Sequence, residues 1–359
     1  MYSTKEILSE FDSLETAEWL KRIEKYLKGK SFDDLVLKLE GGAEIRPFYR
    51  KEDVMPLNLP VLNSNNWLIG ESFAYDAGDT NAFNRALLNA LVNGTESVNL
   101  KIDADNPAQL SDLLENVYLN MIDLNLSGSV FKQAPADWLS ELAALSEGKV
   151  KGFVKTNDNN DSIALLRAFS EKLPNYSFFN FELKIDQGII PNLSILLKEI
   201  AAAFELMLQN GISAERAQAQ INIHTSLSED YFLSIAAIRA LKRLWLGLIE
   251  AYGVDQPQYP KIHCITTQSV TSADPYWNLI SNTTEALSAA VAQVYSIEVR
   301  PTDNSADKAA FSRRIARNVQ HLLKMESHID HIIDPAAGSY YIEHYSAELA
   351  RCAWESFSK

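Results

Sequence analysis

The chain has 359 residues, of which 47% are hydrophobic and 22% are charged, and its formal net charge is −14. This length accommodates one large domain or two of ordinary size, and long single domains are often α/β barrels. Surfaces that bind nucleic acid or anionic lipid need clustered Lys and Arg. The acidic balance therefore argues against both as partners and is typical of a soluble protein.

The N-terminus and the cysteines indicate the compartment. Met1–Glu10 is polar and carries charges of both signs, so it lacks the apolar core of a signal peptide. No apolar run approaches the length of a membrane span. Cys264 and Cys352 match no metal-binding or redox spacing, which favours two free thiols in a reducing compartment. We therefore expect a cytoplasmic protein with no membrane partner.

Residues 1–60 are predicted to form an arm ahead of the main domain. Thr16–Leu27 has apolar residues at helical spacing, and Ile45–Tyr49 reads as an extended stretch. The apolar side chains of the arm, Trp19 and Tyr26 among them, need a surface to cover them. That surface is either a partner protein, for which aromatic anchors are typical, or the chain's own main domain.

Short β-rich runs alternate with longer helical segments through the rest of the chain. The predicted strands are Trp67–Phe73, Ser97–Ile102, Met121–Leu126, Val150–Lys155, Tyr176–Glu182, Gln220–His224, Ile262–Thr267 and Ser296–Arg300. Helical periodicity predicts helices over Thr80–Asn93, from Asn106-Pro107 onward, and over Asp137–Leu145, Ser162–Leu173, Asn192–Asn210, Glu229–Tyr252, Thr283–Gln293 and Arg313–Met325.

Eight such units predict an α/β fold, a (β/α)8 TIM barrel over residues 61–359 with a C-terminal helical extension. Strands buried on both faces should be apolar runs, yet Ser97–Ile102 and Ile221–His224 alternate between apolar and polar residues. Polar residues on inward positions either pack in hydrated layers or face a ligand channel. An open doubly wound sheet is the structural alternative.

Candidate catalytic residues come from position in the fold, because no general catalytic signature is present. The chain has no G-x-S-x-G elbow, P-loop, G-x-G-x-x-G or H-E-x-x-H. His224 and His263 lie on predicted barrel strands, whose C-terminal ends carry the active site in this fold. Asp103 and Arg300 hold similar positions. The alternative for each is a polar interior residue that its neighbours satisfy.

A metal site is not predicted. His328 and His331 are three residues apart and could share a helical face, but no third ligand is evident. The pair is better explained as a solvated helix terminus, where histidine suits the helix dipole. Carboxylates are numerous, and no two of them stand out as an acid/base couple.

The C-terminal third carries the most specific pattern. Its runs follow in order as Ile262–Thr267, Asp274–Asn278, Thr284–Ala286, Phe311–Asn318 and Asp334–Glu343. This series resembles the acyl-CoA mutases that use adenosylcobalamin, methylmalonyl-CoA mutase above all. The arm and first strand are similar to them as well, in Trp19, Leu27–Gly29, Phe32–Leu35, Ile45–Tyr49 and Trp67–Ile69. The likeness is weakest from about Ile102 to Ile221.

The resemblance implies a substrate barrel that is followed, in the whole mutase, by a flavodoxin-like cobalamin domain. In a catalytic chain the acyl-CoA threads through the barrel centre, where small polar residues line the channel. The cofactor is sealed over the barrel mouth so that radical intermediates do not escape. The alternating strands of this chain agree with such a lining.

This sequence departs from the catalytic pattern at four positions. Gly70 and Ser72 replace an arginine for CoA phosphate and a tyrosine beside the radical centre. Around Leu183 the histidine that would hydrogen-bond the thioester carbonyl is missing. Ile265 replaces a glutamine, whose hydrogen bond a branched apolar side chain cannot make. Each lost contact is worth on the order of a few kcal/mol.

The resemblance therefore implies the small subunit of a methylmalonyl-CoA mutase heterodimer, itself non-catalytic, which would pair with the large catalytic subunit. The chain contains no D-x-H-x-x-G, the signature that supplies the lower cobalt ligand. We therefore expect that the cobalamin domain is absent from this chain and that it binds no cofactor, while adenosylcobalamin belongs to the parent complex.

Two other functions stay open. The chain could be an active isomerase on a different acyl-CoA, with cobalamin supplied by another chain and a rebuilt site at His224 and His263. It could also be a barrel that binds a CoA ester as a regulator, so an acyl-CoA stays a further candidate partner. The four substitutions favour the non-catalytic subunit.

Overall fold

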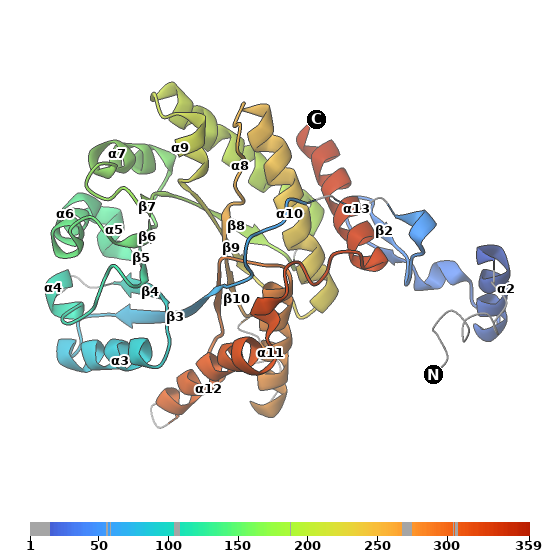
Figure 1. The fold of residues 1–359 in the computed structure, drawn as a ribbon, viewed down its shortest axis with the longest axis horizontal. Coiled ribbons are helices and arrows are strands. Elements are labelled where there is room, and N and C mark those ends of the chain that lie inside the picture. Colours follow the sequence, from blue (N-terminus) through green and yellow to red (C-terminus); the bar gives the residue numbers. More distant parts are fainter. Residues whose placement is uncertain are drawn as a thin grey trace.

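The structure is a computed structural model that describes residues 15–54, 57, 59–103, 108–186, 188–267, 275–303, 305 and 308–359. A ring of parallel strands forms its centre (Figure 1). The strands lie in the order β7-β6-β5-β4-β3-β11-β10-β9-β8. They are β3 (Leu68–Tyr75), β4 (Ser97–Ile102), β5 (Asp123–Ser127), β6 (Lys151–Val154), β7 (Tyr176–Ser177), β8 (Phe179–Lys184), β9 (Ile221–Ser226), β10 (Lys261–Ile265) and β11 (Ser296–Glu298).

The ring closes through β7 and β8, which are two parts of one strand separated only by Phe178. β7 pairs with β6, whereas β8 pairs with β9, so the two ends of the strand order meet within this strand. An open doubly wound sheet would have two separate edge strands. The closed ring excludes that alternative and confirms the predicted (β/α)8 barrel.

Helices cover the outside of the ring (Figure 1). They are α3 (Thr80–Val92), α4 (Leu110–Leu113), α5 (Ser129–Gln133), α6 (Pro135–Ser146), α7 (Asn159–Phe169), α8 (Ile189–Gln209), α9 (Ala214–Gln218), α10 (Tyr231–Ala251), α11 (Pro275–Val291), α12 (Ala309–His321), a π-helical turn η3 (Leu322–Glu326), a 3-10 turn η4 (Ile329–His331) and α13 (Tyr340–Phe357). Aspartates cap the starts of α3, α7 and α10, where each carboxylate accepts orphan backbone N–H groups. No helix among these described elements combines the length and apolar character needed to cross a membrane.

The predicted elements differ from the observed ones in detail. The fifth strand is interrupted at Phe178. α11 begins at Pro275, well before the predicted Thr283, because exposed aromatic side chains in its first turn hide the helical period. The predicted helix start at Asn106-Pro107 lies outside the described residues. α12 and η3 together cover the last predicted helix.

The two faces of the strands explain why the sequence alternates. Side chains that point outward, such as Leu100 of β4 and Leu124 of β5, are fully buried beneath the helices and form the main hydrophobic core. Inward positions carry polar side chains, such as Asn99 and Asn125, which hydrogen-bond to each other. The core therefore lies between sheet and helices, and the barrel interior is polar.

The arm extends away from the barrel (Figure 1). It consists of α2 (Thr16–Tyr26), η1 (Phe32–Leu35), β1 (Leu37–Lys38), β2 (Glu44–Ile45) and η2 (Lys51–Asp53). Trp19 packs on Phe48 with ring centroids 3.9 Å apart, so the arm has a small aromatic cluster of its own. No residue of α2 is buried, and Tyr26 is 83% exposed. The arm helix is thus not folded onto its own barrel.

The base of the arm is anchored on α13, the helical extension after the barrel. Tyr49 stacks on His344 with ring centroids 3.9 Å apart. The backbone N–H of Leu57 donates to Oε2 of Glu343 at 3.1 Å. α13 itself packs against α8 and α10. The domain boundary near residue 60 stays a prediction, since this base is continuous with the barrel.

Candidate functional site

A cavity of about 980 Å³ opens among the C-terminal ends of the barrel strands. Its lining includes Asn99 of β4, Asn180 of β8, His224 of β9 and Glu298 of β11. A volume of this size is typical of small-ligand sites, and active sites of this fold lie at this end of the barrel. The cavity is therefore the candidate functional site.

A hydrogen-bonded network crosses one side of the interior. Oε2 of Glu298 accepts from Oγ of Ser72 and from Nδ2 of Asn99, both at 2.7 Å. Nδ2 of Asn125 donates to Oδ1 of Asn99 at 2.9 Å and to Oγ of Ser97 at 3.0 Å. Burial raises the pKa of Glu298, and the hydrogen bonds from Ser72 and Asn99 oppose that rise. These hydrogen bonds fix the positions of the polar side chains on this side of the barrel interior.

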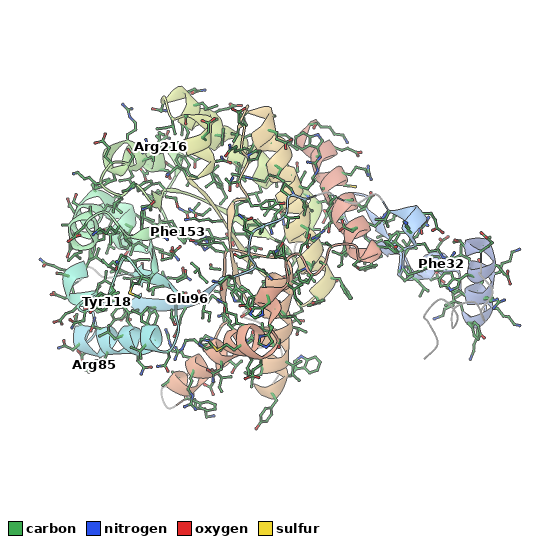
Figure 2. All side chains as sticks on the ribbon, in the orientation of Figure 1. Phe32, Arg85, Glu96, Tyr118, Phe153 and Arg216 are labelled. Atoms are coloured by element: carbon green, nitrogen blue, oxygen red, sulfur yellow. The ribbon has the colours of Figure 1, made fainter. Side chains whose placement is uncertain are left out.

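A row of packed rings lies at the centre of the barrel. Phe153, labelled at the middle of the ring in Figure 2, meets the rings of His224 and His263 edge-on at 4.7 and 5.1 Å. The two imidazoles stack on each other at 5.1 Å. Tyr295 packs against His263 at 5.3 Å, and its hydroxyl donates to Asp123 at 2.6 Å. Phe153, His224 and His263 also line the cavity, so this packed row forms part of its wall.

Both candidate histidines are neutral components of this row. Nε2 of His224 contacts Oδ1 of Asn180 at 3.1 Å, and Nδ1 of His263 contacts Oγ of Ser296 at 2.8 Å. Burial lowers the pKa of both imidazoles, that of His263 to about 3. Neither is therefore a cation at neutral pH. The structure brings the two residues together, whereas their role as catalytic groups stays a prediction.

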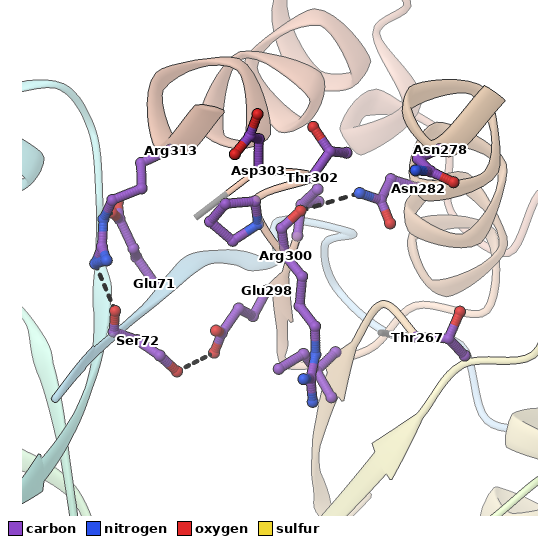
Figure 3. Close-up of a pocket in the computed structure, with 13 residues that line it drawn as sticks. Glu71, Ser72, Thr267, Asn278, Asn282, Glu298, Arg300, Thr302, Asp303 and Arg313 are labelled. Carbon is purple, nitrogen blue, oxygen red and sulfur yellow. Dashed lines mark hydrogen bonds and ion pairs between the residues drawn. The ribbon is translucent and has the colours of Figure 1, made fainter. Parts of the chain in front are cut away.

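A second cavity, of about 470 Å³, adjoins the first (Figure 3). Ser72, Ile265, Glu298, Arg300 and Arg313 line both, so the two form one continuous mouth. The Arg300 side chain extends from the end of β11 past Glu298 toward the interior (Figure 3). Its predicted position at the mouth is therefore observed.

Arg313 belongs to the motif Phe311–Asn318 and has a structural role. Its Nε donates to Oε1 of Glu71 at 2.8 Å, and NH2 donates to the carbonyl of Ser72 at 2.6 Å. The guanidinium also lies 4.5 Å from the ring centre of Phe73. Arg317 binds the other oxygen of Glu71 at 2.6 Å. These contacts attach α12 to β3.

The four departures from the catalytic pattern have different surroundings. A Cβ added at Gly70 would lie 2.9 Å from the carbonyl oxygen of Ile297, so the backbone of β11 occupies the space of any side chain there. Ser72 and Ile265 face the cavity. Leu183 is fully buried in the core, and the cavity side of β8 carries Glu182 instead.

Other predicted candidates lie away from the site. Asp103 accepts from the backbone N–H of Ser129 at 2.7 Å and pairs with Lys101, so it holds the start of α5 and does not line the cavity. His328 and His331 stack at 4.9 Å near the surface. Among the described residues no group of three metal-ligating side chains occurs.

Sequence reasoning missed several charged residues of the cavity, among them three that face its centre or mouth. Lys155, Glu182 and Glu298 all line it. Lys155 lies two residues after Phe153 on the same strand end, and Glu298 lies two residues before the candidate Arg300. That period of two was the available signal, because it places both side chains on the inward face.

The closed ring and the cavity define a (β/α)8 barrel with a ligand-sized opening at its C-terminal mouth. The family model for methylmalonyl-CoA mutase matches residues 192–359. The chain is 31% identical to the methylmalonyl-CoA mutase small subunit of Porphyromonas gingivalis over 98% of this chain and 64% of that protein. For the small subunit of Streptomyces virginiae the identity is 28%, with the same coverage. The chain is therefore similar to the methylmalonyl-CoA mutase small subunits over nearly its whole length, as the sequence motifs indicated.

The chain spans about 64% of the length of these relatives. A solved structure of Plasmodium falciparum HPPK-DHPS covers 88% of this chain and 54% of its own, at 9% identity and a TM-score of 0.44. A likeness of that size carries no argument about this chain.

Proposed function

We propose that this chain is the barrel portion of the small subunit of a methylmalonyl-CoA mutase heterodimer. In this proposal it has no mutase activity of its own and supports a large catalytic subunit that interconverts methylmalonyl-CoA and succinyl-CoA. The names of the relatives imply a large-subunit partner for those proteins. The observation that carries the non-catalytic role is the packed row of Phe153, His224 and His263 at the barrel centre, which in this proposal obstructs the path of a threaded acyl-CoA.

Three features of the mouth support the loss of acyl-CoA binding. The close approach of Ile297 leaves no space at Gly70 for the arginine of a catalytic chain. Arg313 is engaged by Glu71 and by the backbone of β3, so it is not available to replace that arginine. The hydroxyl of Ser72 donates a hydrogen bond to Glu298, so it is already engaged within the barrel wall.

The arm supports pairing with another protein. Leu20, Ile23 and Leu27 of its apolar stripe remain partly exposed, because α2 touches no part of the barrel core. An unpartnered amphipathic helix of this kind gains stability when a second surface covers it. The two cysteines are free and buried, which supports the cytoplasmic setting proposed for the complex.

Adenosylcobalamin is the cofactor of the mutase family generally, but the histidines of this chain do not suit its lower cobalt ligand. Cobalt needs an imidazole nitrogen presented at the surface of a large cavity. His224 and His263 are stacked in the barrel centre, His321 bonds the carbonyl of Asn93, His344 stacks on Tyr49, and His328 stacks on His331. In this proposal adenosylcobalamin is therefore bound by another part of the complex.

Association with the large subunit tests the pairing role. We expect Ile23→Asp, on the apolar stripe of α2, to weaken the measured Kd by at least about tenfold, since it removes a buried aliphatic side chain from an interface. The matched control is Glu24→Gln, which changes a neighbouring exposed position of the same helix. Equal affinities for the two variants and the parent chain would contradict the proposed role of the arm.

Calorimetric titration tests the site. We expect no heat when methylmalonyl-CoA or, separately, adenosylcobalamin is added to the isolated chain. Saturable binding of the CoA ester would favour one of the two alternatives, an active isomerase on another acyl-CoA or a regulatory barrel. Substitution of His224 and His263, followed by assay with the large subunit, would then distinguish between them.

A further inference from the structure

Lys155 is a charged residue of the cavity whose ammonium no described contact accounts for. It follows β6 directly, and its backbone N–H donates to the carbonyl of Leu126 at 2.8 Å, which continues the ladder of the sheet. The side chain lines the cavity. Its ammonium forms no hydrogen bond or ion pair with any residue that the structure describes. Lys101, which lines the same cavity, is instead paired with Asp103 at 2.5 Å.

The surroundings of Lys155 favour the uncharged amine. Enclosure by the barrel wall lowers its pKa, and the negative charges of Glu182 and Glu298 offset this only in part. A lysine whose pKa is lowered in this way carries a larger fraction of neutral amine, which is the nucleophilic form. Lysines in enclosed sites are used in this form to attack carbonyl carbons.

The charge distribution argues against an anion as the ligand. Glu182, Glu199 and Glu298 line the same cavity as Lys155, so a negatively charged ligand would meet like charges. Arg313 is paired with Glu71, and Lys101 with Asp103. Of the other cations in the lining, Arg300 offsets part of this negative charge. An uncharged carbonyl compound meets no such repulsion, and the volume of about 980 Å³ accommodates it.

We propose that Lys155 is a reactive amine that captures small uncharged aldehydes or ketones as an imine within the barrel mouth. The nitrogen lone pair attacks the carbonyl carbon, and a C–N bond forms while the oxygen gains a proton. The oxygen then leaves as water together with both amine hydrogens, and a C=N bond remains. No oxidant or further reactant is needed.

Glu298 is placed to move the proton that this step requires. Its Oε2 holds the hydrogen bonds from Ser72 and Asn99, while Oε1 has no partner among the described residues. Burial raises the pKa of this carboxyl, so a larger fraction of it is protonated near neutral pH than of an exposed glutamate, and the protonated form can donate to the departing oxygen. The capture step uses side chains of this chain alone. Its failure would leave the pairing with a large subunit untouched.

Reductive trapping tests the proposal. The parent chain is incubated at neutral pH with limiting propanal and sodium cyanoborohydride, and the propylated lysines are located by peptide mass spectrometry at short times. We expect Lys155 to be labelled faster than Lys101, which is paired with Asp103, since the lowered pKa of Lys155 raises its fraction of neutral amine. Equal labelling of the two lysines, or slower labelling of Lys155, would overturn the proposal.

Two variants keep the result interpretable. Lys155→Met should abolish the fast labelling, and Lys101→Met, at the matched position on β4, should leave it unchanged. Thermal melting of both variants checks that the barrel is intact. Fast labelling that persists at another lysine of the Lys155→Met variant would show that the reactive amine lies elsewhere, and it would also overturn the assignment.

Discussion

The imidazoles of His224 and His263 stack with 5.1 Å between their centroids and 18° between their planes, because the two residues are directly paired across β9 and β10. With Phe153 they form the centre of the barrel. A stack of two imidazoles is stable only while both stay neutral, since two adjacent cations in a low-dielectric interior would repel. The geometry therefore predicts how the fold responds to acid.

Acidification should destabilise the barrel partly through His263. Its pKa is lowered to about 3 by burial, and that of His224 is lowered as well, whereas both titrate near 6.5 in the unfolded chain. Between these values the unfolded chain binds more protons, so the free energy of unfolding falls as the pH falls. We expect His263→Phe to reduce that slope by up to about 1.4 kcal/mol per pH unit.

Urea unfolding between pH 7 and pH 4.5 measures this slope. His331→Phe is the control, because His331 is exposed and lies outside the barrel. A slope for His263→Phe that matches the parent chain and this control would show that folding does not lower the pKa of His263.

Arg239 should be essential to the junction of α10 and α13. It is 3% exposed and pairs with Asp334 and with Glu343, the latter at 2.9 Å. Arg239→Met would leave two carboxylates without their counter-ion, and we expect a loss of about 3–5 kcal/mol in the free energy of unfolding. Arg351 also contacts two carboxylates, but at the surface, and Arg351→Met should cost less than about 1 kcal/mol. Similar losses in denaturant titrations of the two variants would contradict the difference in burial.

Gly70 should not tolerate a side chain. A Cβ at this position would lie 2.9 Å from the backbone oxygen of Ile297, so Gly70→Ala must displace β11 and should cost about 1–3 kcal/mol. Gly247 lies within α10 with open space around its Cα, and Gly247→Ala should add about 0.5–1 kcal/mol by its better helix propensity. Melting temperatures that shift in the same direction for both would show that β3 and β11 are less closely packed.

Restoring the polar residues of a catalytic chain should not restore ligand binding. The double variant Ser72→Tyr, Ile265→Gln replaces two of the departures that face the cavity. We expect no heat with methylmalonyl-CoA, because Phe153, His224 and His263 still pack together across the barrel centre. Saturable heat from this variant would mean that the substitutions, and not the packed row at the centre, prevent binding.

Much of the barrel could be predicted from local patterns. Each β/α unit carries its own periodicity, caps and stop signals within a few dozen residues, so all eight strands were predicted close to their observed places. The family resemblance was also available, since it rests on short runs in a fixed order, and the matches with the small subunits confirm it.

The site was harder to predict from the sequence, because its contacts join strands that are distant in the chain. Glu298 meets Ser72 and Asn99 only after the ring closes, and Lys155 becomes distinctive only because its ammonium forms no hydrogen bond or ion pair with the described residues there. Asp103 occupies a strand end as expected, but the nearby N–H of Ser129 draws its carboxylate away from the mouth.

Sequence patterns therefore established the elements, their order and the family, whereas the content of the barrel depended on closure and register. A period of two tells which side chains share a face, since that is a property of one strand. It does not tell which side chains meet across the ring, because the interruption at Phe178 and the pairing of β8 with β9 set those distances. Leu183 thus turned into the core, and His224 and His263 came to stack at the centre.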